Sequence, residues 1–106
     1  MTEENTQTVE ADQVQYATLE HTFHDVFSGA DVTVAARFKR PSYPQADRAQ
    51  KEMLKSPARA FQNLCTAVVH PDDKDRLVQN LKIYPGIGST FGGALLKASG
   101  FADLGN

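Results

Sequence analysis

Residues Val32 to Arg40 read V-T-V-A-A-R-F-K-R, which is the clearer of the two strand patterns in the chain. Apolar and polar side chains alternate along it, which is the period of a strand with one buried face. One face carries Val32, Val34, Ala36 and Phe38, and the other carries Thr33, Ala35, Arg37 and Lys39. The run from Leu19 to Phe27 also reads as extended, and Ser28 to Asp31 form a short loop in which a glycine can take a positive φ. Together the two runs predict an antiparallel hairpin.

Four short segments follow the hairpin, and each is opened by a proline. Proline suits the first turn of a helix, because its missing N–H would have no partner there and its φ is already helical. The openings are Tyr43-Pro44, Ser56-Pro57, His70-Pro71 and Tyr84-Pro85. Ser42 and Gln45 match a capping box before a first helix that should run to about Lys55, and Ser56 is placed to cap the second helix. The sequence therefore predicts an α+β fold, with an N-terminal antiparallel hairpin followed by about four short helices.

The helical segments carry apolar side chains at helical spacing, which we expect to face one core. These inward positions are Ala46, Ala49 and Met53 with Leu54 beside them, then Ala60 or Phe61, Leu64, Cys65 and Val68, then Leu77, Val78 and Leu81, and finally Ile87, Phe91, Leu95 and Ala98. Residues 1–13 are acidic and free of aromatics, so we expect a disordered tail there and a single α+β domain over 14–106. Without an apolar run of about 18 residues or a secretory signal, a cytoplasmic location is expected.

Basic side chains concentrate between Arg37 and Arg59, although the formal net charge of the chain is −2. Arg37, Lys39, Arg40, Arg48, Lys51, Lys55 and Arg59 stand against only Asp47 and Glu52 in this segment. Such an excess can bind phosphate backbones or an acidic protein surface. It is also what the solvated outer face of a strand and a helix looks like, and both interpretations stay open.

The ionisable side chains are not spaced for catalysis or metal binding. His70, Asp72, Asp73 and Asp75 crowd together, but on a helix Asp73 turns away from the other two carboxylates, which have a sufficient role as partners of the helix dipole. His21 and His24 fall on opposite faces of a strand. The single cysteine, Cys65, excludes an intrachain disulfide and reads as a small core residue. We therefore expect no enzyme, no metal and no cofactor.

A glycine-rich run, Gly86-Ile87-Gly88-Ser89-Thr90-Phe91-Gly92-Gly93, begins the fourth helical segment. It lacks the Gly-x-Gly-x-x-Gly spacing that binds dinucleotides. Gly88 and Gly92 lie four residues apart and leave a groove that another backbone can approach, flanked by Phe91 and Leu95. The groove can serve packing inside the domain or a partner outside it.

The order of these features resembles that of small tail assembly chaperone proteins from tailed phages and prophages. The resemblance covers about Thr22 to Phe101 and rests on R-F-K-R-P-S-Y-P-Q-A-D-R-A, S-P-A-R-A-F-Q-N-L, V-V-H-P-D-D-K-D-R-L and Y-P-G-I-G-S-T-F-G-G-A-L-L-K-A-S-G-F. It implies a protein that binds the tape measure protein, or another tail protein, in the host cytoplasm and keeps it soluble while the tail tube assembles. It offers no catalytic residues to carry over.

A client helix is expected to lie along the fourth helix and the basic first helix, where the cations would steer an acidic partner. The predicted partner-binding residues are Arg48, Lys51, Lys55, Gly88, Phe91, Gly92 and Leu95. Replacing Gly92 with leucine is expected to abolish client binding and to leave the fold intact. The alternative function is a small nucleic-acid-binding regulator that uses residues 37–59. A homo-oligomer is among the expected assemblies, and no membrane partner is expected.

Overall fold

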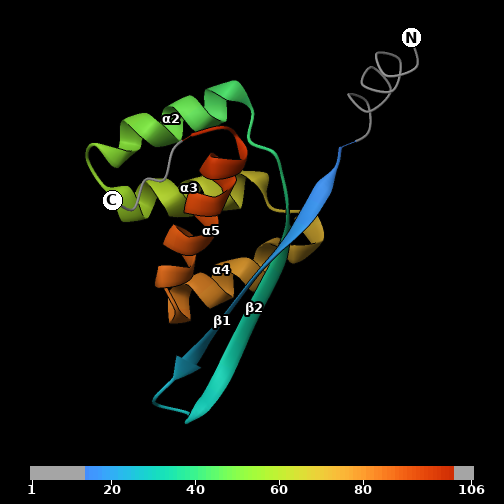
Figure 1. Cartoon of the computed structure of the whole chain (residues 1–106), viewed down its shortest axis with the longest axis vertical. Helices are drawn as coiled ribbons and strands as arrows, with labels where there is room; N and C mark the ends of the chain where they lie inside the picture. Colours follow the sequence, from blue (N-terminus) through green and yellow to red (C-terminus); the bar gives the residue numbers. More distant parts are fainter. Residues whose placement is uncertain (1–13, 102–106) are drawn as a thin grey trace.

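The computed structural model of the chain describes residues 14–101. A hairpin of β1 (Tyr16–Asp25) and β2 (Ala30–Lys39) leads into four helices, as Figure 1 shows. The helices are α2 (Tyr43–Met53), α3 (Pro57–Val68), α4 (Lys74–Ile83) and α5 (Gly86–Ala98), with a short 3-10 turn η1 (Pro71–Asp73) before α4. The predicted α+β fold is confirmed, while the tail predicted at residues 1–13 lies outside the described residues.

The hairpin pairs without a bulge from Tyr16 opposite Lys39 to Asp25 opposite Ala30. Its turn is Val26 to Gly29, where Gly29 takes a φ of +76° and donates its N–H to the Asp25 carbonyl at 2.8 Å. The predicted first strand, Leu19 to Phe27, therefore ends two residues too late and begins three residues after Tyr16. Val26 and Phe27 are exposed turn residues, because the chain must reverse before Ala30 can pair with Asp25.

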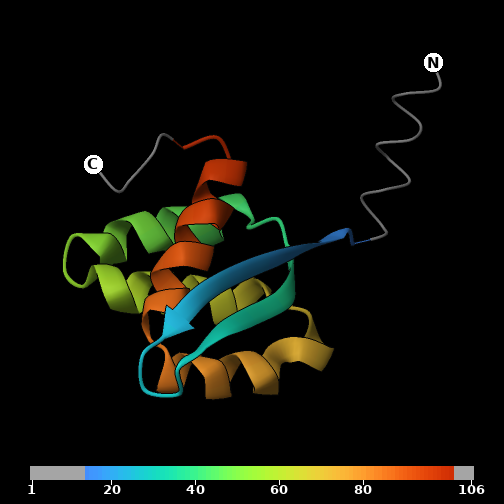
Figure 2. The ribbon, with the colours of Figure 1, turned by 60° about the horizontal axis from the view of Figure 1, so that its bottom comes forward.

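One face of the hairpin is covered by the helices, which lie together behind it in Figure 2. Val34, Ala36 and Phe38 of β2 are buried, as their alternation predicted, and Leu19 and Phe23 of β1 are half-buried on the same face. The Phe38 ring meets the Phe91 ring of α5 with 5.4 Å between centroids. β2 is therefore the more deeply buried strand, and β1 is the less covered one.

The beginnings of α2 and α3 use different local chemistry. Ser42 accepts from the Gln45 N–H at 3.3 Å and donates its own N–H to Gln45 Oε1 at 2.9 Å, which confirms the capping box. Ser56 occupies the cap position of α3 but makes no side-chain cap bond, so that prediction was wrong. Between residues 14 and 101, no helix has the length and apolar character needed to cross a membrane.

The core matches most of the predicted inward positions. Its buried members in the helices are Ala46, Ala49, Ala60, Leu64, Cys65, Val68, Leu77, Leu81, Ile87, Phe91, Leu95 and Leu96. Leu54 and Ala98 were also predicted to face inward, but both are exposed. Leu54 caps the end of α2 and Ala98 is the last residue of α5, so both lie at helix ends.

Candidate functional site

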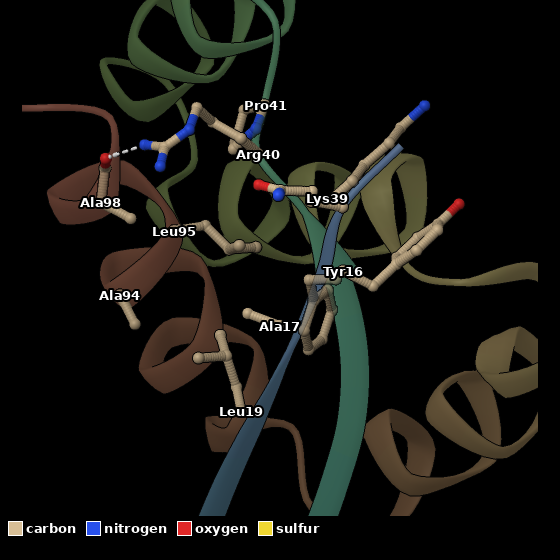
Figure 3. Close-up of a pocket in the computed structure, with 11 residues that line it drawn as sticks. Tyr16, Ala17, Leu19, Lys39, Arg40, Pro41, Ala94, Leu95 and Ala98 are labelled. Carbon is tan, nitrogen blue, oxygen red and sulfur yellow. Dashed lines mark hydrogen bonds between the residues drawn. The ribbon is translucent and has the colours of Figure 1, made fainter. Parts of the chain in front are cut away.

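An open apolar groove of about 370 Å³ lies between the start of β1 and the second half of α5. Figure 3 shows Ala17 and Leu19 of β1 pointing across it toward Ala94 and Leu95 of α5. Phe38, Pro41 and Ala98 complete the apolar lining. We call this feature the β1–α5 groove.

The groove exists because two lightly covered surfaces face each other across it. Leu19 belongs to the less covered strand of the hairpin and is only half-buried. Ala94 and Ala98 lie one turn apart on α5, and both are exposed because their methyl groups are too small to reach β1. Small side chains on the helix therefore leave a hollow that larger ones would fill.

One cation lies at the end of the β1–α5 groove. Arg40 follows β2, and its Nη1 donates a hydrogen bond to the carbonyl of Ala98 at the C-terminal end of α5. A positive charge is favourable there because the helix dipole is negative at that end. The side chains of Tyr16 and Lys39 point away from α5 in Figure 3. The groove thus has apolar walls and a guanidinium at one end, which suits an apolar segment that carries an acidic residue.

The structure places the predicted partner-binding residues of α5 inside the domain. Gly88, Phe91, Gly92 and Leu95 are buried, and the two glycines face α3. A Cβ at position 88 would lie 2.8 Å from Cγ of Gln62. The glycine groove is therefore filled by α3, which corrects the prediction that these residues form an outer surface together. Leu95 also borders the β1–α5 groove.

The same contacts correct the expectation that Gly92→Leu would leave the fold intact. A Cβ at position 92 would already lie 2.8 Å from Cβ of Phe61. A leucine there needs α3 and α5 to separate, so a loss of binding in this variant would report on folding.

The predicted basic residues lie on the solvent side of α2 and in the turn that follows it. Arg48, Lys51 and Lys55 are exposed, and Lys51 forms an ion pair with Asp47 at 3.1 Å. α2 packs against α3, not beside the β1–α5 groove. The structure therefore does not bring the two halves of the predicted partner surface together.

Arg37 belongs to the basic segment, but Asp73 of η1 binds it. The carboxylate of Asp73 accepts from the backbone N–H, Nε and Nη2 of Arg37, each at 2.9 Å, and it lies 3.4 Å from Nη2 of Arg76. These hydrogen bonds from Arg37 hold the pKa of Asp73 well below its usual range. Sequence reasoning missed this pair, because nothing local links positions 37 and 73.

The histidine and carboxylates around η1 have structural partners. His70 Nδ1 accepts from the Asp72 N–H at 3.0 Å, and the backbone N–H of His70 donates to the Arg37 carbonyl at 2.8 Å. Over residues 14–101, no three His, Cys, Asp or Glu side chains gather as they would around a metal ion. The segment holds α4 against β2.

Cys65 lies in the core, as its apolar neighbours in the sequence predicted. It is fully buried, and its thiol donates to the Gly88 carbonyl at 3.7 Å. Burial raises the pKa of this thiol to about 12. The side chain therefore stays a neutral packing group at physiological pH.

Comparison with known proteins defines the family. The chain resembles in fold a solved structure described as an uncharacterised protein, rbstp2171, from Bacillus stearothermophilus, with a TM-score of 0.68 and 22% sequence identity. That match covers 96% of this chain and 98% of the other. No curated protein matches this sequence. Residues 15–106 match the family described as a domain of unknown function, DUF6848, and the chain therefore belongs to that family.

Proposed function

We propose that this protein is a tail assembly chaperone of a phage or prophage, which binds the tape measure protein while the tail is built. The observation that carries the proposal is the β1–α5 groove, an open apolar hollow with Arg40 at one end. The resemblance of residues 22–101 to such chaperones supports the same assignment. A chaperone of this kind needs an accessible apolar surface for its client and performs no reaction.

The client segment that fits the groove is an amphipathic helix. Its apolar side chains, spaced three or four residues apart, would lie between Leu19 of β1 and Ala94 of α5. An acidic side chain at one end would lie near Arg40, so that charge sets the direction of the helix. Covering the apolar stripe of the client in this way would keep it from aggregating before assembly.

The experiment is co-expression of the full chain with the tape measure protein of the same genome. The Ala94→Arg variant places a long charged side chain in the groove at an exposed helical position, so the fold should persist. We expect at least a tenfold drop in the client that co-purifies and a matching fall in its soluble fraction. Ala58→Arg is the matched control, because Ala58 is an exposed alanine of α3 away from the groove.

The two variants separate the outcomes. If Ala94→Arg binds the client as well as Ala58→Arg does, the groove is not the site. If the wild-type chain neither binds the tape measure protein nor raises its soluble fraction, the proposed function fails. The nucleic-acid alternative predicts instead a salt-dependent mobility shift with mixed DNA, which should weaken when Arg48 and Lys55 are replaced by alanine.

A further inference from the structure

The outer edge of β1 carries backbone groups that no other described residue binds. Arg37 of β2 directs its N–H to Asp73 and its carbonyl to the His70 N–H, both away from β1. Thr18, which lies opposite Arg37 in the hairpin, therefore belongs to a pair without mutual hydrogen bonds. Along an antiparallel ladder such pairs alternate with hydrogen-bonded pairs. It follows that the N–H and C=O groups of Thr18, Glu20, Thr22 and His24 point out of the free edge. Within residues 14–101, none of these groups has a backbone hydrogen bond.

The two edges of the hairpin differ sharply. Between Ala35 and Phe38 the β2 edge is covered by the connection between α3 and α4, through the Phe38–Val69 bridge, and by α4, through a bond of 3.0 Å from Arg76 Nη2 to the Ala35 carbonyl. The β1 edge is ten residues long and reads Y-A-T-L-E-H-T-F-H-D, without a proline, a lysine or a bulge. Those are the devices that normally prevent an edge strand from pairing. The β1 edge is thus open to another strand.

We infer that β1 pairs antiparallel with β1 of a second copy of this chain. An outward-bonding residue must then face an outward-bonding residue of the second copy, which leaves few registers. Glu20 facing Glu20 of the second copy opposes like charges. Glu20 facing His24 of the second copy would set Leu19 against Asp25. Glu20 facing Thr18 of the second copy shortens the overlap to residues 16–22 and leaves Phe23 outside it.

One register avoids these faults. When Glu20 faces Thr22 of the second copy, Leu19 faces Phe23 of that copy on the helix-covered side, and residues 17–25 of both strands overlap. His21 then lies at the twofold axis and faces its own counterpart. Leu19 and Phe23 are only half-buried in one copy. In this register Leu19 of each copy would contact Phe23 of the other copy, so both side chains would become more buried in both copies.

The result is a four-stranded antiparallel sheet with the order β2, β1, β1 of the second copy and β2 of the second copy. A twofold axis perpendicular to the sheet keeps the helices of both copies on one side. The inference does not rest on the proposed function, because it concerns the chain without a client.

The first test is the mass of the full chain in solution, measured by light scattering over a series of concentrations. Glu20→Pro removes one outward N–H, and an edge strand tolerates proline where its N–H faces solvent. We expect the wild type to be a dimer and the control Glu20→Ala to remain one. The dissociation constant of the Glu20→Pro dimer should be at least tenfold higher than that of the wild type. Circular dichroism checks that each variant is folded.

The second test fixes the register by disulfide formation under mild oxidation. His21→Cys should cross-link two copies rapidly, because residues facing each other at the axis have Cβ atoms about 5 Å apart. Leu19→Cys should not, since the two thiols would lie about 13 Å apart along the strands. The natural Cys65 is buried and does not compete. A monomeric wild type, a dimer that survives Glu20→Pro, or equal cross-linking of the two cysteine variants would each overturn the inference.

Discussion

Gly92 of α5 faces Phe61 of α3 so closely that a Cβ at position 92 would lie 2.6 Å from Cδ1 of the ring and 3.0 Å from Cα of Phe61. The absence of a side chain at Gly92 is what lets the two helices approach. Their contact holds α3 and α5 together at the core, where the Phe91 ring of α5 meets the Phe38 ring of β2.

This contact predicts a large difference between two adjacent glycines. Gly92→Ala should lower the free energy of unfolding by about 1 to 3 kcal/mol, because the methyl group overpacks a tight helix contact. At Gly93 an added Cβ would meet nothing within 4 Å, so Gly93→Ala should be neutral or raise stability by up to about 1 kcal/mol through helix propensity. Urea unfolding of both variants measures the difference. Equal effects would mean that α3 and α5 do not touch at this point.

The Arg37–Asp73 pair predicts how stability depends on pH. The pKa of Asp73 is lowered in the folded protein by its bonds from Arg37, so this carboxylate stabilises the fold above its unfolded pKa, near 4. That contribution is lost as the pH falls from about 4 toward the folded pKa. We expect Asp73→Asn to be less stable at pH 7 and to lose part of the acid dependence. Unfolding in urea between pH 2 and 7 measures both.

A neighbouring carboxylate supplies the control for this experiment. Asp75 lies exposed in the first turn of α4, and Asp75→Asn should keep the acid dependence of the wild type. If Asp73→Asn and the wild type lost stability in parallel on acidification, the Arg37–Asp73 pair would not be the source of the acid dependence.

The two serine caps make a further matched pair. Ser42→Ala removes a hydroxyl that accepts from the Gln45 N–H and should cost about 1 kcal/mol of stability. Ser56→Ala removes a hydroxyl that makes no cap bond, so its cost should be clearly smaller. Thermal unfolding followed by circular dichroism compares them. A larger loss for Ser56→Ala would contradict the capping geometry at both helices.

Local patterns predicted the fold well where the physical cause is local. The alternation in β2, the prolines in the first turns of α2 and α3 and the Ser42–Gln45 box each act over a few residues, and each appears in the structure. Pro71 instead opens the 3-10 turn η1, and Pro85 is the residue before α5. The candidate site was harder to predict. The cations of α2 and the glycines of α5 looked like one surface in the sequence, but α3 covers the glycines and α2 lies elsewhere.

Near neighbours in the chain specify which segments become strands and helices and which face of β2 is buried, because side-chain period, capping and proline geometry act over a few residues. Packing between distant segments makes Asp73 bind Arg37, lets α3 fill the glycine groove, and leaves β1 with an open edge beside an apolar hollow. Those features join residues far apart in the chain, and the packing of the helices on one face of the hairpin brings them together or leaves them exposed.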